Sequence, residues 1–241
     1  MFLVVTIINI YPAHAILGGF IPNNYSNLPL VALLIEIAGN KSRKVCTGTL
    51  IRPKTVLTAA HCFEGAGLTK ITLVRALNIY AGDRVTQQIS NSQIFVHPEY
   101  IDFEKGDDFA IIKLTEILPD IENLTYPTLT TSTNYDRYIF LGYGLDENSK
   151  LGQLKKVFKN KDTMLNTRSD EAHLIRFDQK DLKGISAGDS GGPVITVVDN
   201  QAYLIAVSSQ NRRVVGGLSG SLDGSMTKLS APTIAWINSF M

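Results

Sequence analysis

The sequence predicts an all-β chain that ends in a single helix. Short apolar or alternating runs separated by turn residues recur over residues 16–229, which is typical of antiparallel sheets rather than of alternating strands and helices. The last segment differs, because a proline stands near its start and its apolar side chains recur at three- and four-residue spacing. These side chains are Ile234, Trp236, Ile237 and Phe240. We expect this helix to pack its apolar face against the sheets.

The apolar runs fall into two groups of similar size. A polar connection with many turn residues, 118–133, separates them. We therefore predict an N-terminal domain over residues 16–122 and a C-terminal domain over residues 123–241. The predicted strands span residues 31–37, 45–51, 55–59, 71–77, 93–96, 109–114, 138–142, 154–158, 174–177, 194–198, 202–208 and 225–229.

Length and charge exclude several classes of protein. A chain of 241 residues with 44% hydrophobic content can bury a large core. Its 23 Lys and Arg residues nearly balance its 22 Asp and Glu residues, so no strong electric field attracts nucleic acid or an anionic membrane surface. The sequence also lacks metal-ligand spacing and phosphate-binding glycine loops. We expect no cofactor, no metal, and neither a nucleic acid nor a membrane as a partner.

Residues 1–15 have the features of a signal peptide. An apolar run is followed by Ala13-His14-Ala15, the small-residue pattern of a cleavage site. No basic residue precedes the run, and a buried first strand is the alternative. A signal peptide implies a secreted or periplasmic protein, in which Cys46 and Cys62 are expected to form a disulfide. In a cytosolic protein they would be two buried thiols.

The segment 188–193, with the sequence Gly-Asp-Ser-Gly-Gly-Pro, places one hydroxyl among glycines. Glycines allow backbone N–H groups to be presented to a developing negative charge, so the segment predicts a nucleophile, Ser190, beside an oxyanion hole. An ordinary turn is the alternative, because Gly, Asp and Ser are all common in turns.

A serine hydroxyl is a weak nucleophile unless a base removes its proton and a third group orients that base. Among the histidines, only His61 ends an apolar run, after the small residues Ala59 and Ala60. Asp108 stands directly before another apolar run, where a partly buried carboxylate needs a donor such as the imidazole of His61. The alternatives are a structural histidine and a solvated turn aspartate, and the latter fits Asp107 better.

Three blocks of the chain resemble the signature blocks of trypsin-like serine proteases of the chymotrypsin family, and they occur in that family's order. The resemblance implies two perpendicular antiparallel β-barrels with the active site in the cleft between them. It also implies that His61 takes the proton of Ser190 while Asp108 orients the imidazole. The blocks are 58–62 (Thr-Ala-Ala-His-Cys), 108–114 (Asp-Phe-Ala-Ile-Ile-Lys-Leu) and 188–193.

The same resemblance gives roles to other residues. It implies that the backbone N–H groups of Gly188 and Ser190 form the oxyanion hole. It further implies that Asp189 forms an ion pair with the α-amino group created by a cut before Ile16. Precursors in this family are usually cut after a basic residue, whereas residue 15 here is alanine. We therefore expect that removal of the leader itself exposes Ile16 and activates the protein.

The specificity pocket departs from that of trypsin. Gly184 stands where trypsin carries the aspartate that binds basic side chains, so the resemblance implies a preference for uncharged ones. Asp223, which precedes Gly224 in the far wall of the pocket, could restore a negative charge or be only a turn residue. Ser208 and Gln210 lie in the segment that replaces the family's common Ser-Trp-Gly, and its backbone is expected to pair with an extended substrate. Gln210 is expected to narrow the entrance.

Together these features predict a secreted serine endopeptidase that hydrolyses peptide bonds through an acyl-enzyme. Its expected partners are polypeptide substrates and protein protease inhibitors. The alternative is a non-catalytic binding module on the same fold, because function resides in sites rather than in folds. Such modules commonly lose a residue of the triad, and this chain retains His61, Asp108 and Ser190.

Overall fold

The computed structural model describes most of the chain after the predicted signal peptide. It describes residues 16, 18–23, 25–37, 43–65, 68–102, 105–146, 148, 150–213 and 221–241, and for residues 43, 68, 210–213, 221 and 222 the backbone alone. The predicted signal peptide, residues 1–15, lies outside the described residues.

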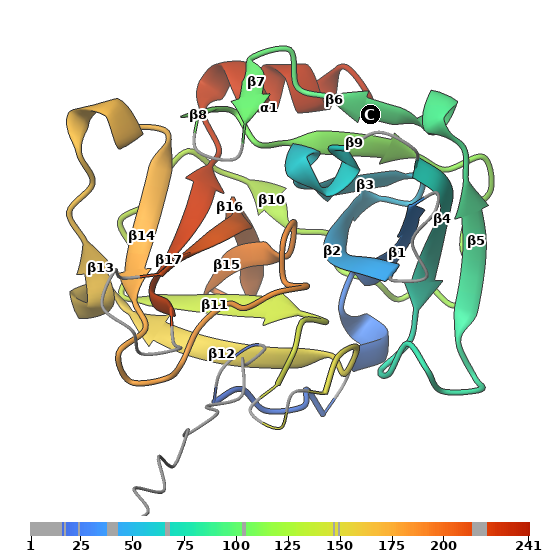
Figure 1. The fold of residues 1–241 in the computed structure, drawn as a ribbon, viewed down its shortest axis with the longest axis horizontal. Helices are drawn as coiled ribbons and strands as arrows, with labels where there is room; N and C mark the ends of the chain where they lie inside the picture. Colours follow the sequence, from blue (N-terminus) through green and yellow to red (C-terminus); the bar gives the residue numbers. More distant parts are fainter. Residues whose placement is uncertain are drawn as a thin grey trace, which may run out of the picture.

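The first half of the chain forms one curled sheet (Figure 1). Among the described residues its strand order is β5-β4-β1-β2-β3-β9-β6, and every neighbouring pair is antiparallel. A short antiparallel pair, β7 with β8, lies between β6 and β9 in the sequence. The strands are β1 (Leu30–Ile37), β2 (Arg43–Arg52), β3 (Thr55–Thr58), β4 (Leu68–Arg75), β5 (Val85–Ile89), β6 (Ile94–Val96), β7 (Tyr100–Asp102), β8 (Lys105–Gly106) and β9 (Ala110–Lys113).

The second half forms another curled sheet, on the left in Figure 1. Its order among the described residues is β12-β11-β15-β16-β17-β14-β13, and β10 pairs with β16 in parallel. Its strands are β10 (Thr128–Leu129), β11 (Arg137–Gly142), β12 (Lys155–Asn160), β13 (Met164–Leu165), β14 (Leu174–Asp178), β15 (Pro193–Val198), β16 (Gln201–Arg213) and β17 (Ser221–Lys228). The 3-10 helices are η1 (Tyr25–Asn27), η2 (Ala60–Phe63), η3 (Asn91–Gln93), η4 (Lys161–Thr163) and η5 (Ser169–Glu171).

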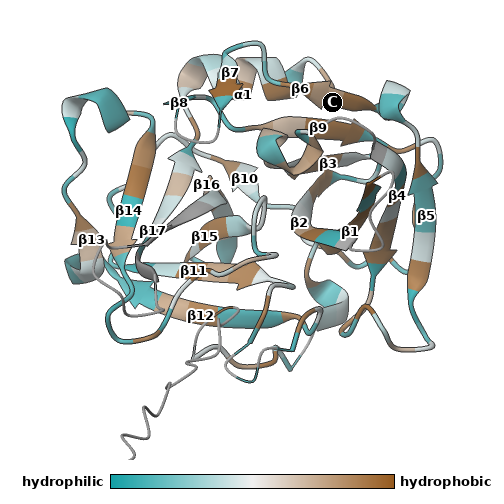
Figure 2. Ribbon diagram, in the orientation of Figure 1, coloured by the Kyte–Doolittle hydropathy of each residue, from teal (hydrophilic) through white to brown (hydrophobic). Residues whose placement is uncertain are grey.

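Alternating side chains of β1 explain how the two sheets are joined. Val31, Leu33 and Ile35 are buried in the core of the first sheet. Leu30 and Ala32 point the other way and pack in a cluster with Leu141, Tyr143 and Leu154 of the second half. Because successive side chains of a strand point to opposite faces, one strand contributes to both clusters. Figure 2 shows apolar residues in the strands of both sheets.

The C-terminal helix α1 (Ala231–Asn238) closes back over the first sheet (Figure 1). Its first turn contains Pro232 and is capped by Ser230, whose Oγ accepts from the N–H of Thr233. Ile237 is fully buried with Phe109 and Ile111 of the first half. The helix therefore ties the end of the chain to the sheet that carries β9. Within the described residues, no helix has the length and apolar character needed to cross a membrane.

The all-β prediction, with two curled antiparallel sheets and one terminal helix, is confirmed. Each predicted strand range overlaps a strand of the structure, whereas β5, β7, β8, β10 and β13 were not predicted. The connection 118–133 was expected to be polar, but three of its side chains are buried in the core of the first sheet: Leu118, Ile121 and Leu124. The division into domains at residues 122 and 123 stays a prediction.

Candidate active site

His61 and Asp108 lie side by side because β3 pairs with β9. Thr58 and Ala110 are register partners in this antiparallel pair, so η2, which follows β3, meets the residues that precede β9. The imidazole Nδ1 of His61 lies 2.7 Å from Oδ2 of Asp108. The backbone N–H of His61 donates to Oδ1 of the same carboxylate at 2.9 Å. Asp108 thus holds both the ring and the backbone of His61.

Asp108 is almost completely buried, with 1% of its surface exposed. A third donor is the hydroxyl of Ser209, which lies 2.5 Å from Oδ2. Burial raises the pKa of Asp108, but the hydrogen bonds from His61 and Ser209 outweigh it, so the pKa of this carboxyl is lowered overall. Asp108 is therefore held as a carboxylate beside His61.

Two contacts fix the short helix η2 that carries His61. The predicted disulfide between Cys46 and Cys62 is present and joins η2 to β2. The ammonium of Lys44, on the same strand, donates to the carbonyl oxygen of His61 at 2.7 Å. Lys44 was not singled out from the sequence, because nothing in its neighbours predicts that a surface-type residue reaches this carbonyl.

The segment that carries Ser190 is held by contacts with the first half of the chain. The carbonyl oxygen of Ser190 accepts from the N–H of Thr47 at 2.8 Å and lies 3.8 Å from Sγ of Cys62, the residue after His61. Thr47 also donates through its hydroxyl to the carbonyl of Gly188 at 3.0 Å. Gly191 has φ +81°, and a Cβ on it would lie 2.1 Å from Oγ1 of Thr58. The close approach of β2 and β3 thus requires a glycine next to the serine.

Ser190 borders a cavity of about 330 Å³. The cavity is lined by residues from both halves of the chain: Lys44, Val45, Leu145, Leu151, Ala187, Gly188 and Ser190. Among the hydrogen bonds of the described residues, none has the N–H of Gly188 or of Ser190 as its donor. Two backbone donors beside the serine are therefore available to an external acceptor.

Asp189 lies behind this segment, fully buried. Its Oδ1 accepts from the N–H of Gly144 and its Oδ2 from that of Ser186, both at 2.9 Å. The backbone N–H of Ile16 is a further donor, and the Ile16 side chain is buried in the core of the second sheet. Burial raises the pKa of Asp189 to about 7, although the hydrogen bonds from Gly144, Ser186 and Ile16 act in the opposite direction.

The raised pKa of Asp189 predicts a pH-dependent stability of the uncut chain. Its folded-state pKa of about 7 exceeds the usual aspartate value of 3.8, so the stabilisation is complete below about pH 4 and is lost as the pH rises to 7. We expect the free energy of unfolding to fall by on the order of 4 kcal/mol from this group. Asp189→Asn should remove that part of the slope. Urea unfolding of both proteins at pH 4, 5.5 and 7 measures this pH dependence, and equal slopes would contradict a raised pKa of Asp189.

Two of the predicted pocket residues meet at a side chain that sequence reasoning missed. Gly184 and Gly224 are both buried, and both α-carbons lie against the carboxamide of Gln179. Gln179 is fully buried, although it stands in a polar stretch between Asp178 and Lys180. A buried glutamine in such a stretch has no signature in the sequence.

Asp223 is neither a turn residue nor a free charge. It lies within β17, opposite Asp178 of β14, so the turn interpretation is wrong. Its carboxylate forms an ion pair with the guanidinium of Arg176. Arg176 also lies 3.3 Å from the carboxylate of Glu171, so it is shared by two acids and offsets the negative charge of Asp223 in part.

Ser208 is less accessible than expected for a residue that pairs with a substrate. Its backbone N–H donates to Gly192 at 2.8 Å, and its carbonyl accepts from Gly191 at 2.7 Å. Both backbone groups of Ser208 are thus bonded within the chain, and the pairing of segment 208–210 with a substrate strand stays a prediction. Ser209 supplies the hydroxyl that reaches Asp108. The side chain of Gln210 lies outside the described residues, so a narrowed entrance stays a prediction.

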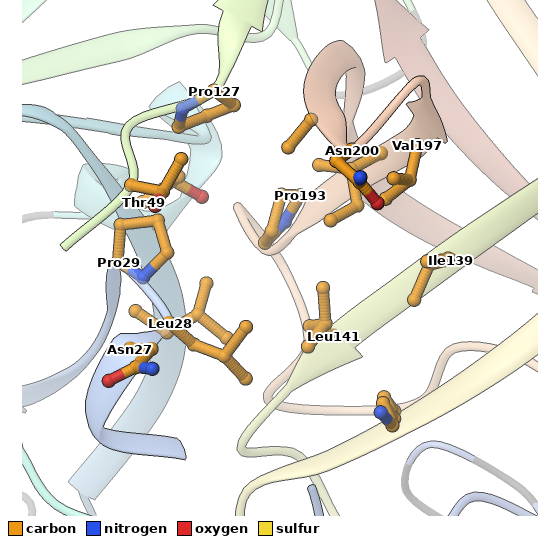
Figure 3. A pocket seen from close by; sticks show the side chains of 15 residues that line it. Asn27, Leu28, Pro29, Thr49, Pro127, Ile139, Leu141, Pro193, Val197 and Asn200 are labelled. Carbon is orange, nitrogen blue, oxygen red and sulfur yellow. The ribbon is translucent and has the colours of Figure 1, made fainter. Parts of the chain in front are cut away.

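A second cavity, of about 260 Å³, lies between the two halves of the chain and has mostly apolar walls (Figure 3). Leu28, Pro29 and Thr49 line it from the first half, and Ile139 and Pro193 are among the residues that line it from the second. It contains none of the residues predicted to form the triad or the specificity pocket.

Comparisons with known proteins give matches over most of the chain. A family model described as Trypsin matches residues 22–229. The chain is 30% identical to brachyurin of Leptuca pugilator over 167 residues, which are 62% of this chain and 70% of that protein. It is 28% identical to granzyme E of Mus musculus over 226 residues, 86% of each chain. It is also 28% identical to duodenase-1 of Bos taurus over 200 residues, 76% of each chain.

Proposed function

This chain belongs to the trypsin family of serine proteases, and we propose that it is a secreted serine endopeptidase with His61, Asp108 and Ser190 as its catalytic triad. Ser190 Oγ attacks the scissile carbonyl while Nε2 of His61 accepts its proton. Asp108 keeps the Nδ1–H tautomer and stabilises the imidazolium. The proton then passes to the leaving amine, and water hydrolyses the acyl-enzyme by the same route.

The observation that carries this proposal is the combination of a buried Asp108 held by His61 with two unused N–H groups beside Ser190. The N–H groups of Gly188 and Ser190 point to an oxyanion hole, since neither donates within the described residues. Each such donor is worth about 3 kcal/mol of transition-state stabilisation in other enzymes. A non-catalytic binding module would need neither arrangement, and the comparisons give that alternative no support.

We further propose that activation depends on a cut before Ile16. In the uncut chain Asp189 accepts from the amide N–H of Ile16, and burial raises the pKa of its carboxyl. A cut would replace the amide with a charged ammonium at the same nitrogen, and this ammonium would form an ion pair with Asp189. Because Asp189 is adjacent to Ser190, that pair would fix the backbone of the oxyanion hole. Removal of the leader after residue 15 would supply the cut.

The activation proposal predicts a strict requirement for Ile16 as the first residue. Removing one partner of a buried ion pair costs about 3–5 kcal/mol, so one glycine inserted before Ile16 should lower kcat/KM by at least about 100-fold. N-terminal sequencing of the exported protein identifies its first residue, and peptide hydrolysis assays measure kcat/KM. A glycine added after Met241 is the matched control and should change nothing. A mature start at another residue, or full activity of the glycine-extended form, would contradict the proposal.

The pocket proposal concerns the side chain before the cleaved bond, called P1. Gly184 brings no charge to the pocket, and Asp223 is paired with Arg176. We therefore propose uncharged P1 side chains rather than Lys or Arg. Polypeptides are the proposed substrates, protein protease inhibitors are further proposed partners, and export follows from the predicted leader.

A further inference from the structure

Gln179 is held rigidly next to the residues that are proposed to form the specificity pocket. It directly follows β14 and is fully buried. Its Oε1 accepts from the backbone N–H of Ile185 at 2.7 Å, and its Nε2 donates to the carbonyl of Ile185 at 3.2 Å. Both ends of the carboxamide are therefore occupied, as a buried polar group requires.

The carboxamide fills the space beside two glycines. A Cβ on Gly184 would lie 2.1 Å from Oε1 of Gln179, and a Cβ on Gly224 would lie 2.4 Å from the same oxygen. Gly184 also has φ +152°, a conformation that favours glycine. The two glycines thus make room for Gln179 rather than for an incoming substrate.

The carboxamide of Gln179 lies next to a buried apolar residue. Ile185, to whose backbone it is bonded, belongs to the second core, and a Cβ on Gly224 would lie 2.9 Å from the Ile185 side chain. The nearby Asp223 forms an ion pair with Arg176, and the amide oxygen of Gln179 already accepts from Ile185. A Lys or Arg side chain that reached this point would have to bury its charge beside an occupied amide, which is costly.

We propose that Gln179 determines the P1 specificity by closing the floor of the pocket between Gly184 and Gly224. The pocket then accepts small uncharged side chains such as alanine and excludes aromatic or long ones, which would collide with the carboxamide. This inference rests on the proposed peptidase function and on the position of its pocket.

The test compares Gln179→Ala with the unchanged protein on peptides that differ only at P1, with alanine, phenylalanine or lysine. Removal of the carboxamide should raise the ratio of kcat/KM for phenylalanine to that for alanine by about 10- to 100-fold, and lysine should stay poor. Gln93→Ala is the matched control, because its carboxamide is also bonded to backbone at both ends, to Ser90 N–H at 2.9 Å and to Lys113 carbonyl at 2.7 Å. That control should leave the ratio unchanged.

A merely structural role would lower kcat/KM for alanine and phenylalanine together, and this result would overturn the inference. An unchanged ratio in an active variant would overturn it as well. If Gln179→Ala does not fold, as judged by circular dichroism, Gln179→Ser gives the same comparison with a smaller polar residue. If the unchanged protein with Ile16 as its first residue hydrolyses none of the peptides, that result contradicts the proposed function and the inference that rests on it.

Discussion

Ser190→Ala is expected to lower kcat for peptide hydrolysis by about 10⁴- to 10⁶-fold, the range typical of nucleophile removal in Ser-His-Asp enzymes. The loss follows because no acyl-enzyme can form without the hydroxyl. Folding should be unchanged, since the carbonyl oxygen of Ser190, rather than its hydroxyl, bonds to Thr47. Steady-state assays with a peptide substrate and a thermal unfolding curve measure the two effects separately.

The control for this variant is Ser132→Ala, because Ser132 is exposed in the connection between the two halves. It should retain full turnover. Activity of Ser190→Ala above about one hundredth of normal would mean that another group is the nucleophile.

Asp108→Asn is expected to lower kcat by about 10⁴-fold, as the equivalent change does in well-studied triads. The carboxylate accepts from Nδ1–H of His61, and an amide NH₂ group there would favour the other tautomer, in which Nε2 carries the proton and cannot act as a base. Substrate binding should change much less than kcat, because Asp108 is almost completely buried.

The neighbouring Asp107 provides a matched control for that change. Its carboxylate accepts from the hydroxyl of Thr233 at 2.7 Å rather than from His61, so Asp107→Asn should keep nearly normal kcat. Steady-state kinetics on both variants decides between the two aspartates. Equal losses would contradict the assignment of Asp108 as the orienting group.

The strands on either side of the proposed triad could be predicted because each has a local pattern. The runs around His61 and Asp108 end and begin at strongly apolar strands, but the pairing of β3 with β9 that brings the two residues together came only from the structure. The missed strands β7, β8, β10 and β13 have two or three residues each, too few to show an alternation. Most side chains of β5 are exposed or half-buried, and the strand contains too few apolar residues to be predicted from the sequence.

The pocket could not be predicted because its residues depend on partners far apart in the sequence. Ser209 reaches Asp108 from a distance of 101 residues along the chain, at an irregularity between Ser208 and Gln210 in the register of β16 with β17. Counting alternate residues through such a bulge assigns the wrong face. Asp223 forms an ion pair with Arg176, 47 residues earlier, and that pairing depends on the register of β14 with β17.

Covalent labelling of Ser190 tests the central claim most directly. An organophosphonofluoridate phosphonylates an activated serine: a bond forms between Oγ and phosphorus, fluoride leaves and His61 takes the proton. With Ile16 as the first residue, the protein should gain the mass of one phosphonyl group, which peptide mapping should locate on Ser190. The adduct should be absent in Ser190→Ala and form far more slowly in Asp108→Asn. An unlabelled Ser190 in this protein, or a label on another residue, would contradict the assignment of Ser190 as the nucleophile.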